Sequence, residues 1–182
     1  MKNHLLTLLV MALLLPVILP AQDASLPRDA KSGLISYSAV KEVAGTNSAA
    51  LYQRAIGWAS AFYKNPADVI RERDSSGGKI VCKARFKIAN PADKKGLVTD
   101  AGNVMYTLSI QFKDGRYRYE MTAFNWKQPS YFACEKWMDK TSASYLPVYE
   151  SYLQQTTAEA IRVLNSLEKA LSTAAAENKD DW

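Results

Sequence analysis

The sequence predicts a two-layer α+β domain in which helices cover one face of a curved, five-stranded antiparallel sheet. The 182 residues are 48% hydrophobic and 23% charged, which is the composition of one ordinary globular domain. Residues 79–89 and 103–112 alternate apolar and polar side chains with a period of two, a pattern typical of half-buried antiparallel strands. Apolar residues at helical spacing occur both before and after these two segments.

The N-terminal segment predicts export. A positively charged start at residues 1–4 precedes an apolar run over residues 5–19, and small or polar residues follow, in the order of a secretory signal peptide. We place cleavage after Ala21, so that residues 1–21 are the signal peptide and residues 22–33 are a polar leader. Pro16 within the apolar run and Pro20 directly after it weaken a continuous spanning helix, so we expect no transmembrane anchor after cleavage. The mature chain is then periplasmic or extracellular.

The predicted domain core, residues 34–145, contains five strands. We expect them at residues 34–43, 67–74, 79–89, 103–112 and 116–124. The last three form a meander, because a polar loop and the tight turn Lys113-Asp114-Gly115 join them. Alternation along the fifth strand points Tyr117, Tyr119, Met121 and Ala123 inward.

Two helices complete the predicted order β-α-β-β-β-β-α. The first occupies residues 49–63, with N-cap side chains in residues 45–48 and an end at Asn65-Pro66. The second begins at Leu146, extends to residue 177 and leaves a frayed tail at residues 178–182. Its apolar stripe favours packing on the sheet, with a coiled-coil seam as the alternative.

Four segments of this pattern resemble a family of uncharacterised bacterial secreted proteins with a TATA-binding-protein-like (TBP-like) fold. They are Lys41-Glu42-Val43, Ala50-Leu51-Tyr52-Gln53-Arg54-Ala55-Ile56-Gly57-Trp58, Gly78-Lys79-Ile80-Val81 and Lys113-Asp114-Gly115-Arg116-Tyr117-Arg118-Tyr119-Glu120. The resemblance spans residues 34–124. It implies a curved antiparallel sheet with helices on its convex side, but it implies no activity and no catalytic residues.

The outward face of the predicted sheet is the first candidate site. Five cations face outward on two of its strands: Lys83, Arg85, Lys87, Arg116 and Arg118. Residues 71–118 carry 11 basic and 5 acidic side chains, whereas residues 146–182 carry 3 basic and 6 acidic ones. This asymmetry favours an anionic partner, such as an envelope protein, an acidic glycan or a lipid headgroup. The alternative is a solvated face that serves only solubility.

Aromatic residues and cysteines give two further candidates. An aromatic patch of Trp126, Tyr131, Phe132 and Trp137 either lines a binding surface or caps the open end of the core. The sequence contains two cysteines, Cys82 and Cys134. They either form a disulfide in an oxidising compartment or serve as small apolar side chains.

The residue types argue against most enzyme classes. The single histidine, His4, lies within the predicted signal peptide, so the mature chain has no imidazole for acid–base catalysis or metal binding. We expect no catalytic residues, no metal and no cofactor, and export makes nucleic acid an unsuitable partner. The predicted function is a non-enzymatic binding module of the bacterial cell envelope. The alternative is a carrier that holds a lipid-like ligand in an apolar cavity between the sheet and the C-terminal helix.

Overall fold

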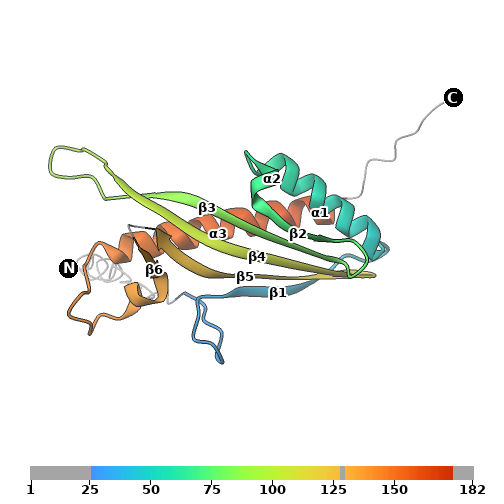
Figure 1. Ribbon diagram of the computed structural model, residues 1–182, viewed down its shortest axis with the longest axis horizontal. Coiled ribbons are helices and arrows are strands. Elements are labelled where there is room, and N and C mark those ends of the chain that lie inside the picture. Colours follow the sequence, from blue (N-terminus) through green and yellow to red (C-terminus); the bar gives the residue numbers. More distant parts are fainter. Residues whose placement is uncertain (1–25, 128–129, 174–182) are drawn as a thin grey trace, which may run out of the picture.

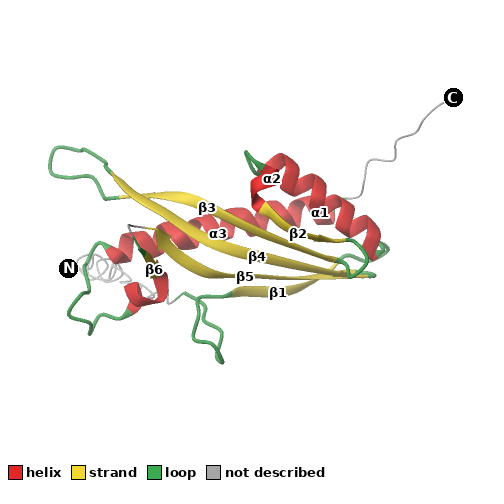
Figure 2. Ribbon diagram, in the orientation of Figure 1, coloured by secondary structure: helices red, strands yellow, loops and turns green. Residues whose placement is uncertain are grey.

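The computed structural model describes residues 26–127 and 130–173. The predicted signal peptide, the cleavage site after Ala21 and the predicted tail at residues 178–182 lie outside the described residues. A six-stranded antiparallel sheet forms one layer, and two long helices cover one of its faces (Figures 1 and 2). The predicted α+β class is therefore confirmed, with one strand more than expected.

The elements follow one another in nearly the predicted order. They are β1 (Tyr37–Glu42), α1 (Ser48–Phe62), α2 (Pro66–Val69), β2 (Ile70–Asp74), β3 (Lys79–Ala89), β4 (Asp100–Lys113), β5 (Arg116–Lys127), β6 (Tyr131–Ala133), the 3-10 helix η1 (Cys134–Met138) and α3 (Tyr149–Ser172). The strand order across the sheet is β1-β5-β4-β3-β2, and β6 pairs with the far end of β5. The long strands β3, β4 and β5 therefore form the predicted meander at the centre.

Several boundaries differ from the prediction: β1 is shorter, β4 and β5 are longer, α3 ends at Ser172 rather than at residue 177, and three further differences have a local cause or change an element. Residues 66–69 form a single helical turn rather than the start of a strand, because proline is well suited to the first helical position. The segment 131–138, which shows no periodicity, folds into β6 and η1. The C-terminal helix begins at Tyr149 instead of Leu146, which is exposed.

A bulge in β5 changes which of its side chains face the core. Met105 pairs with Asn125 and Thr107 pairs with Thr122, so three steps along β5 match two steps along β4. Ala123 occupies the bulge with φ 56°, the only non-glycine residue with positive φ in the described chain. The prediction that Ala123 faces inward is wrong, because the extra residue shifts the alternation and buries Phe124 completely.

Two helices cover the inner face of the sheet. The side chain of Asn47 caps α1 by accepting a hydrogen bond from the Ala50 N–H at 2.8 Å, within the predicted cap segment. Helix α3 contacts α1 and β3, and its apolar stripe is buried there, as expected for packing on the sheet. The Gln155 amide side chain exchanges two hydrogen bonds of 2.9 Å with the backbone of Ala89, which fixes α3 against the end of β3. No helix in the described ranges is long and apolar enough to cross a membrane.

The two cysteines are free thiols in the core. Cys82 lies opposite Leu108 in the middle of the sheet. Cys134 follows β6, which the sheet order places three strands away from β3. The disulfide alternative is therefore not what the structure shows, because paired cysteines need their Cα atoms within about 7 Å. Burial raises the pKa of both thiols, that of Cys82 to about 12.

We expect both thiols to resist alkylation in the native protein at pH 8. Their pKa values lie well above this pH, so almost no reactive thiolate is present, and burial blocks access. Mass spectrometry after iodoacetamide treatment should find no adduct on native protein and two adducts on protein unfolded in guanidinium. Rapid modification of native protein, or an unfolded chain that accepts no label, would contradict the assignment of buried free thiols.

The bulge gives a second prediction. Ala123→Gly is expected to leave the free energy of unfolding unchanged or to raise it by about 1 kcal/mol, because glycine adopts positive φ without a steric clash from Cβ. Ala123→Val should lower it by about 1–2 kcal/mol. Urea unfolding measures both. The control Ala39→Gly, in extended β1, should lower the free energy of unfolding by about 1 kcal/mol. Equal losses for the two glycine variants would show that the bulge conformation carries no strain.

Candidate functional site

The face of the sheet opposite the helices carries all five predicted cations; we call it the open face. Helices α1 and α3 lie together on the other side (Figure 1). Cross-strand partners share a face, so the register places Lys83 beside Thr107 and Arg118 beside Gln111, on the side away from the core. The sequence prediction of an outward basic face therefore agrees with the register.

The register divides these cations into two groups. Arg116 and Arg118 lie at the β4–β5 hairpin, and we call this the hairpin end. Lys83, Arg85 and Lys87 lie toward the β3–β4 loop, which we call the loop end. Between them is a cross-strand row made by Val81, Ser109 and Glu120. The single continuous basic face expected from alternation is therefore two basic regions, because alternation fixes the face of a residue but not its position along the sheet.

Ion pairing differs between the two faces. On the helix side and its margins, Lys41 pairs with Glu168, Arg162 with Glu159 and Lys140 with Glu150. On the open face, Lys87 pairs with Asp100 and Lys79 with Glu72. Within the described ranges, five other open-face cations form no ion pair: Lys83, Arg85, Lys113, Arg116 and Arg118. All five are exposed to solvent.

Two adjoining hollows lie at the hairpin end. The larger has a volume of about 330 Å³ and is lined by Val40, Gln111, Lys113, Arg116, Tyr117 and Arg118. The smaller, of about 100 Å³, is lined by Ser109, Gln111, Arg118, Tyr119 and Glu120. Because Gln111 and Arg118 line both, the two hollows form one depression across β1, β5 and β4.

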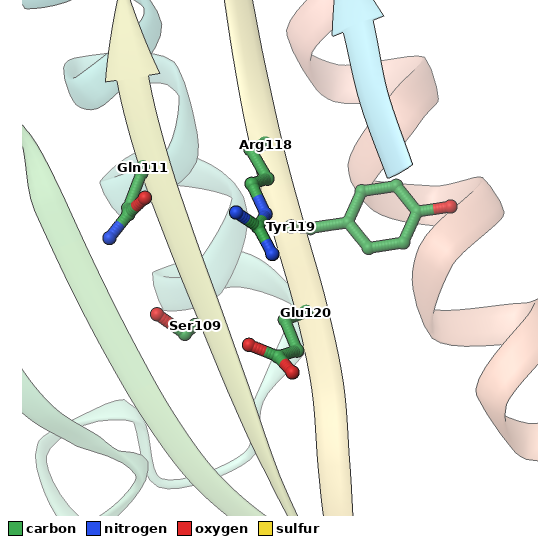
Figure 3. Close-up of a pocket in the computed structure, with 5 residues that line it drawn as sticks. All are labelled: Ser109, Gln111, Arg118, Tyr119 and Glu120. Carbon is green, nitrogen blue, oxygen red and sulfur yellow. The ribbon is translucent and has the colours of Figure 1, made fainter. Parts of the chain in front are cut away.

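The smaller hollow combines hydrogen-bond donors with one carboxylate (Figure 3). Ser109 and Gln111 extend from β4, Arg118 and Glu120 extend from β5, and these four side chains share the open face, whereas Tyr119 points away from them. The Arg118 guanidinium offers a planar fork of N–H donors that matches a carboxylate or phosphate. Ser109 and Gln111 add neutral donors, and Glu120 repels an anion. This arrangement can hold one anionic group beside Arg118.

The predicted aromatic patch is mostly core. Trp137 is fully buried, and Trp126 and Phe132 pack edge-to-face on one another. Trp126 and Trp137 are in ring contact with each other and with Tyr149 of α3, so they close the end of the core. Tyr131 alone is strongly exposed, at 64%. The interpretation of the segment as a cap on the core therefore describes three of its four residues.

Val40 and Lys113 are site residues that the sequence reasoning missed. Val40 lines the larger hollow because β1 pairs with β5, which places Val40 opposite Arg118. The alternation within β1 does not show which strand lies beside it. The sequence predicts Lys113 in the turn, whereas in the structure it ends β4 and pairs with Arg116. A period-two reading carried one residue further along β4 would have placed Lys113 on the outward face. In the described part of the chain, no three His, Cys, Asp or Glu side chains gather in a metal-binding arrangement.

Comparison with solved structures finds the same fold in five chains, which include two bacterial proteins. The crystal structure of a DUF4468 family protein from Bacteroides ovatus matches with a TM-score of 0.65 at 15% identity, covering 83% of this chain and 92% of that one. A TBP-like protein from Parabacteroides distasonis matches with a TM-score of 0.63 at 15% identity, covering 81% and 98%. A search of curated proteins finds no significant match.

The family comparison agrees with the fold. The family described as "Domain of unknown function (DUF4468) with TBP-like fold" matches residues 37–127, which extend from the first residue of β1 to the last residue of β5. The match therefore includes α1, the whole meander and the hairpin-end depression, and it ends before β6 and α3. The resemblance drawn from the sequence is confirmed: the chain belongs to the DUF4468 family, whose domain has a TBP-like fold.

Proposed function

We propose that this protein is a non-enzymatic binding module of the bacterial cell envelope, and that the hairpin-end depression holds an anionic group of its partner. The observation that carries the proposal is the set of Lys113, Arg116 and Arg118. These three exposed cations line one depression and form no ion pair with any described residue. Glu120 lines the smaller hollow beside Arg118, and Glu42 is the cross-strand partner of Arg116, so the three cations outnumber the two neighbouring carboxylates. An anionic ligand lowers the repulsion that remains between the cations.

The chemistry of the depression favours a compact anion. Arg118 can bind a carboxylate or phosphate through two parallel hydrogen bonds, while Gln111 and Ser109 donate from the neighbouring strand. Val40, 57% exposed, adds an apolar rim for the part of the partner that carries the anion. An acidic protein side chain, an acidic glycan and a phosphorylated headgroup all present such a group.

The predicted signal peptide supports the envelope as the proposed location. The proposal of a periplasmic or extracellular protein rests on the apolar run at residues 5–19 and its flanks. The non-enzymatic part rests on the residue types, because the only histidine precedes the predicted cleavage site. The alternative of a carrier is less well supported, since both hollows described above lie on the open face rather than beneath α3.

The proposal predicts that Arg116→Glu/Arg118→Glu will lower affinity for a compact polyanion at least about tenfold, because charge-assisted hydrogen bonds are each worth about 1.5–3 kcal/mol. Isothermal titration with inositol hexakisphosphate as the probe measures this in the chain from residue 22 onward. Lys64→Glu/Lys169→Glu makes the same change in net charge at two exposed positions, one in the bend after α1 and one in α3, and should cost less than about threefold.

A third variant tests the same depression in the opposite direction. Glu120→Gln removes the carboxylate beside Arg118 and should raise affinity for the probe about two- to threefold. Equal losses in the two charge-reversal variants would indicate non-specific attraction to net charge. That outcome, or wild-type protein that does not bind the probe, would remove the depression as a binding site.

A further inference from the structure

The loop between β3 and β4, residues 90–99, projects beyond the sheet as an ordered hairpin (Figure 1). At its base the Asn90 N–H donates to the Thr99 carbonyl at 2.9 Å. At its tip the Asp93 carboxylate accepts hydrogen bonds from the backbone N–H groups of Lys95 and Leu97, at 2.8 and 2.9 Å. The side chains at the tip are therefore presented on a structured turn.

Two adjacent aliphatic side chains next to this tip are exposed to solvent. Leu97 is 61% exposed and Val98 is 58% exposed, and the exposed Lys94 and Lys95 immediately precede Gly96. Single exposed apolar residues are common on soluble proteins and need no explanation. Lys94 and Lys95 occupy the centre of the turn, which the Gly96 N–H closes by donating to the Asp93 carbonyl at 2.9 Å, and Leu97 and Val98 follow it. Two exposed aliphatic side chains in succession next to two lysines form a projecting surface that is both positive and apolar. Such a surface is suited to the boundary between lipid headgroups and acyl chains.

The same end of the sheet adds an aromatic residue and further cations. One cross-strand row joins Lys87, Asn103, Lys127 and Tyr131; its Lys87 end lies next to the base of the loop, and Tyr131 lies at its other end, on β6. Among the large hydrophobic residues that the structure describes, Tyr131 is the most exposed. Tyrosine favours membrane interfaces because its ring is apolar and its hydroxyl is polar.

The two acidic residues of the loop and its base, Asp93 and Asp100, interact with groups of the protein itself. Asp93 accepts the two backbone hydrogen bonds of the tip, and Asp100 forms an ion pair with Lys87 at 3.5 Å. In the described ranges, Lys94, Lys95 and Lys127 form no ion pair. The loop end therefore has a net positive charge beside exposed apolar side chains.

We propose that the loop end docks on an anionic lipid bilayer. Leu97 and Val98 enter the boundary of the headgroup region, Lys94, Lys95 and Lys127 contact lipid phosphates, and Tyr131 lies at the interface. The proposal goes beyond the proposed function, because Lys113 at the hairpin end is about 30 Å from Asn103 along β4. The two surfaces can be occupied together, with the bilayer at one end and the anionic partner at the other.

Vesicle flotation tests this proposal. The chain from residue 22 onward retains every described element and lacks the apolar N-terminal run, which would itself bind lipid. The probes are vesicles of phosphatidylcholine with and without phosphatidylglycerol. We expect binding only with phosphatidylglycerol, and weaker binding as salt is raised. Leu97→Ser/Val98→Ser and Lys94→Glu/Lys95→Glu should each lower the partition coefficient about tenfold.

Matched controls separate the loop end from the rest of the surface. Leu34→Ser/Ile161→Ser removes two exposed apolar side chains elsewhere, and Lys64→Glu/Lys169→Glu reverses two exposed lysines elsewhere. Both should change partitioning less than about threefold. Arg116→Glu/Arg118→Glu should lose the compact polyanion but partition no worse than the lysine control, so failure of one proposal is distinguishable from failure of the other.

Three results would overturn the docking proposal. The first is wild-type protein that does not float with anionic vesicles. The second is partitioning that survives Leu97→Ser/Val98→Ser, which would indicate adsorption by charge alone. The third is binding to heparin, a soluble acidic polysaccharide, that depends on Lys94 and Lys95 in the absence of any vesicle binding. That result would assign the loop end to a soluble polyanion.

Discussion

The burial of one face of the β3–β4–β5 meander determines the positions of all other parts of the molecule. Ile80, Leu108 and Met121 are completely buried on that face, as are Leu167 and Leu171 on the helix that covers it. Shortening such a side chain to alanine typically costs about 2–5 kcal/mol, a large part of the stability of a small domain. Because both helices are needed on the apolar side, the opposite face remains open, and its polar side chains are free to bind a partner.

The bulge in β5 allows the same strand to bury aromatic side chains at the far end of the core. Without the extra residue at Ala123, strict alternation would direct Phe124 and Trp126 to the open face. With it, Phe124 is buried, and the Trp126 indole N–H donates to the Ala101 carbonyl at 2.7 Å. The left-handed backbone of Ala123 therefore allows one long strand to bury odd-numbered side chains before the bulge and even-numbered ones after it.

Period-two alternation was enough to predict the α+β class, the meander, the faces of β3 and β4, and the five outward cations. It was insufficient at Ala123, because nothing in an Ala-Phe dipeptide signals a bulge. It also could not predict that the five cations separate into two groups, because their positions along the sheet depend on the register of the strands. This register places the row of Val81, Ser109 and Glu120 between the two groups. Register and the pairing of β1 with β5 are long-range features, and they placed Val40 in the depression without any local signal.

The strand order has a consequence for solubility. The three longest strands occupy the interior of the sheet, whereas β2 and β1 at its margins have only five and six residues. A long, flat, apolar edge is a template on which other chains can add strands and aggregate. Here the margins are short, and their tips carry charges such as Glu42 and Asp74. The long strands, whose unpaired N–H and C=O groups would best recruit another chain, are therefore kept from contact with other molecules at high protein concentration.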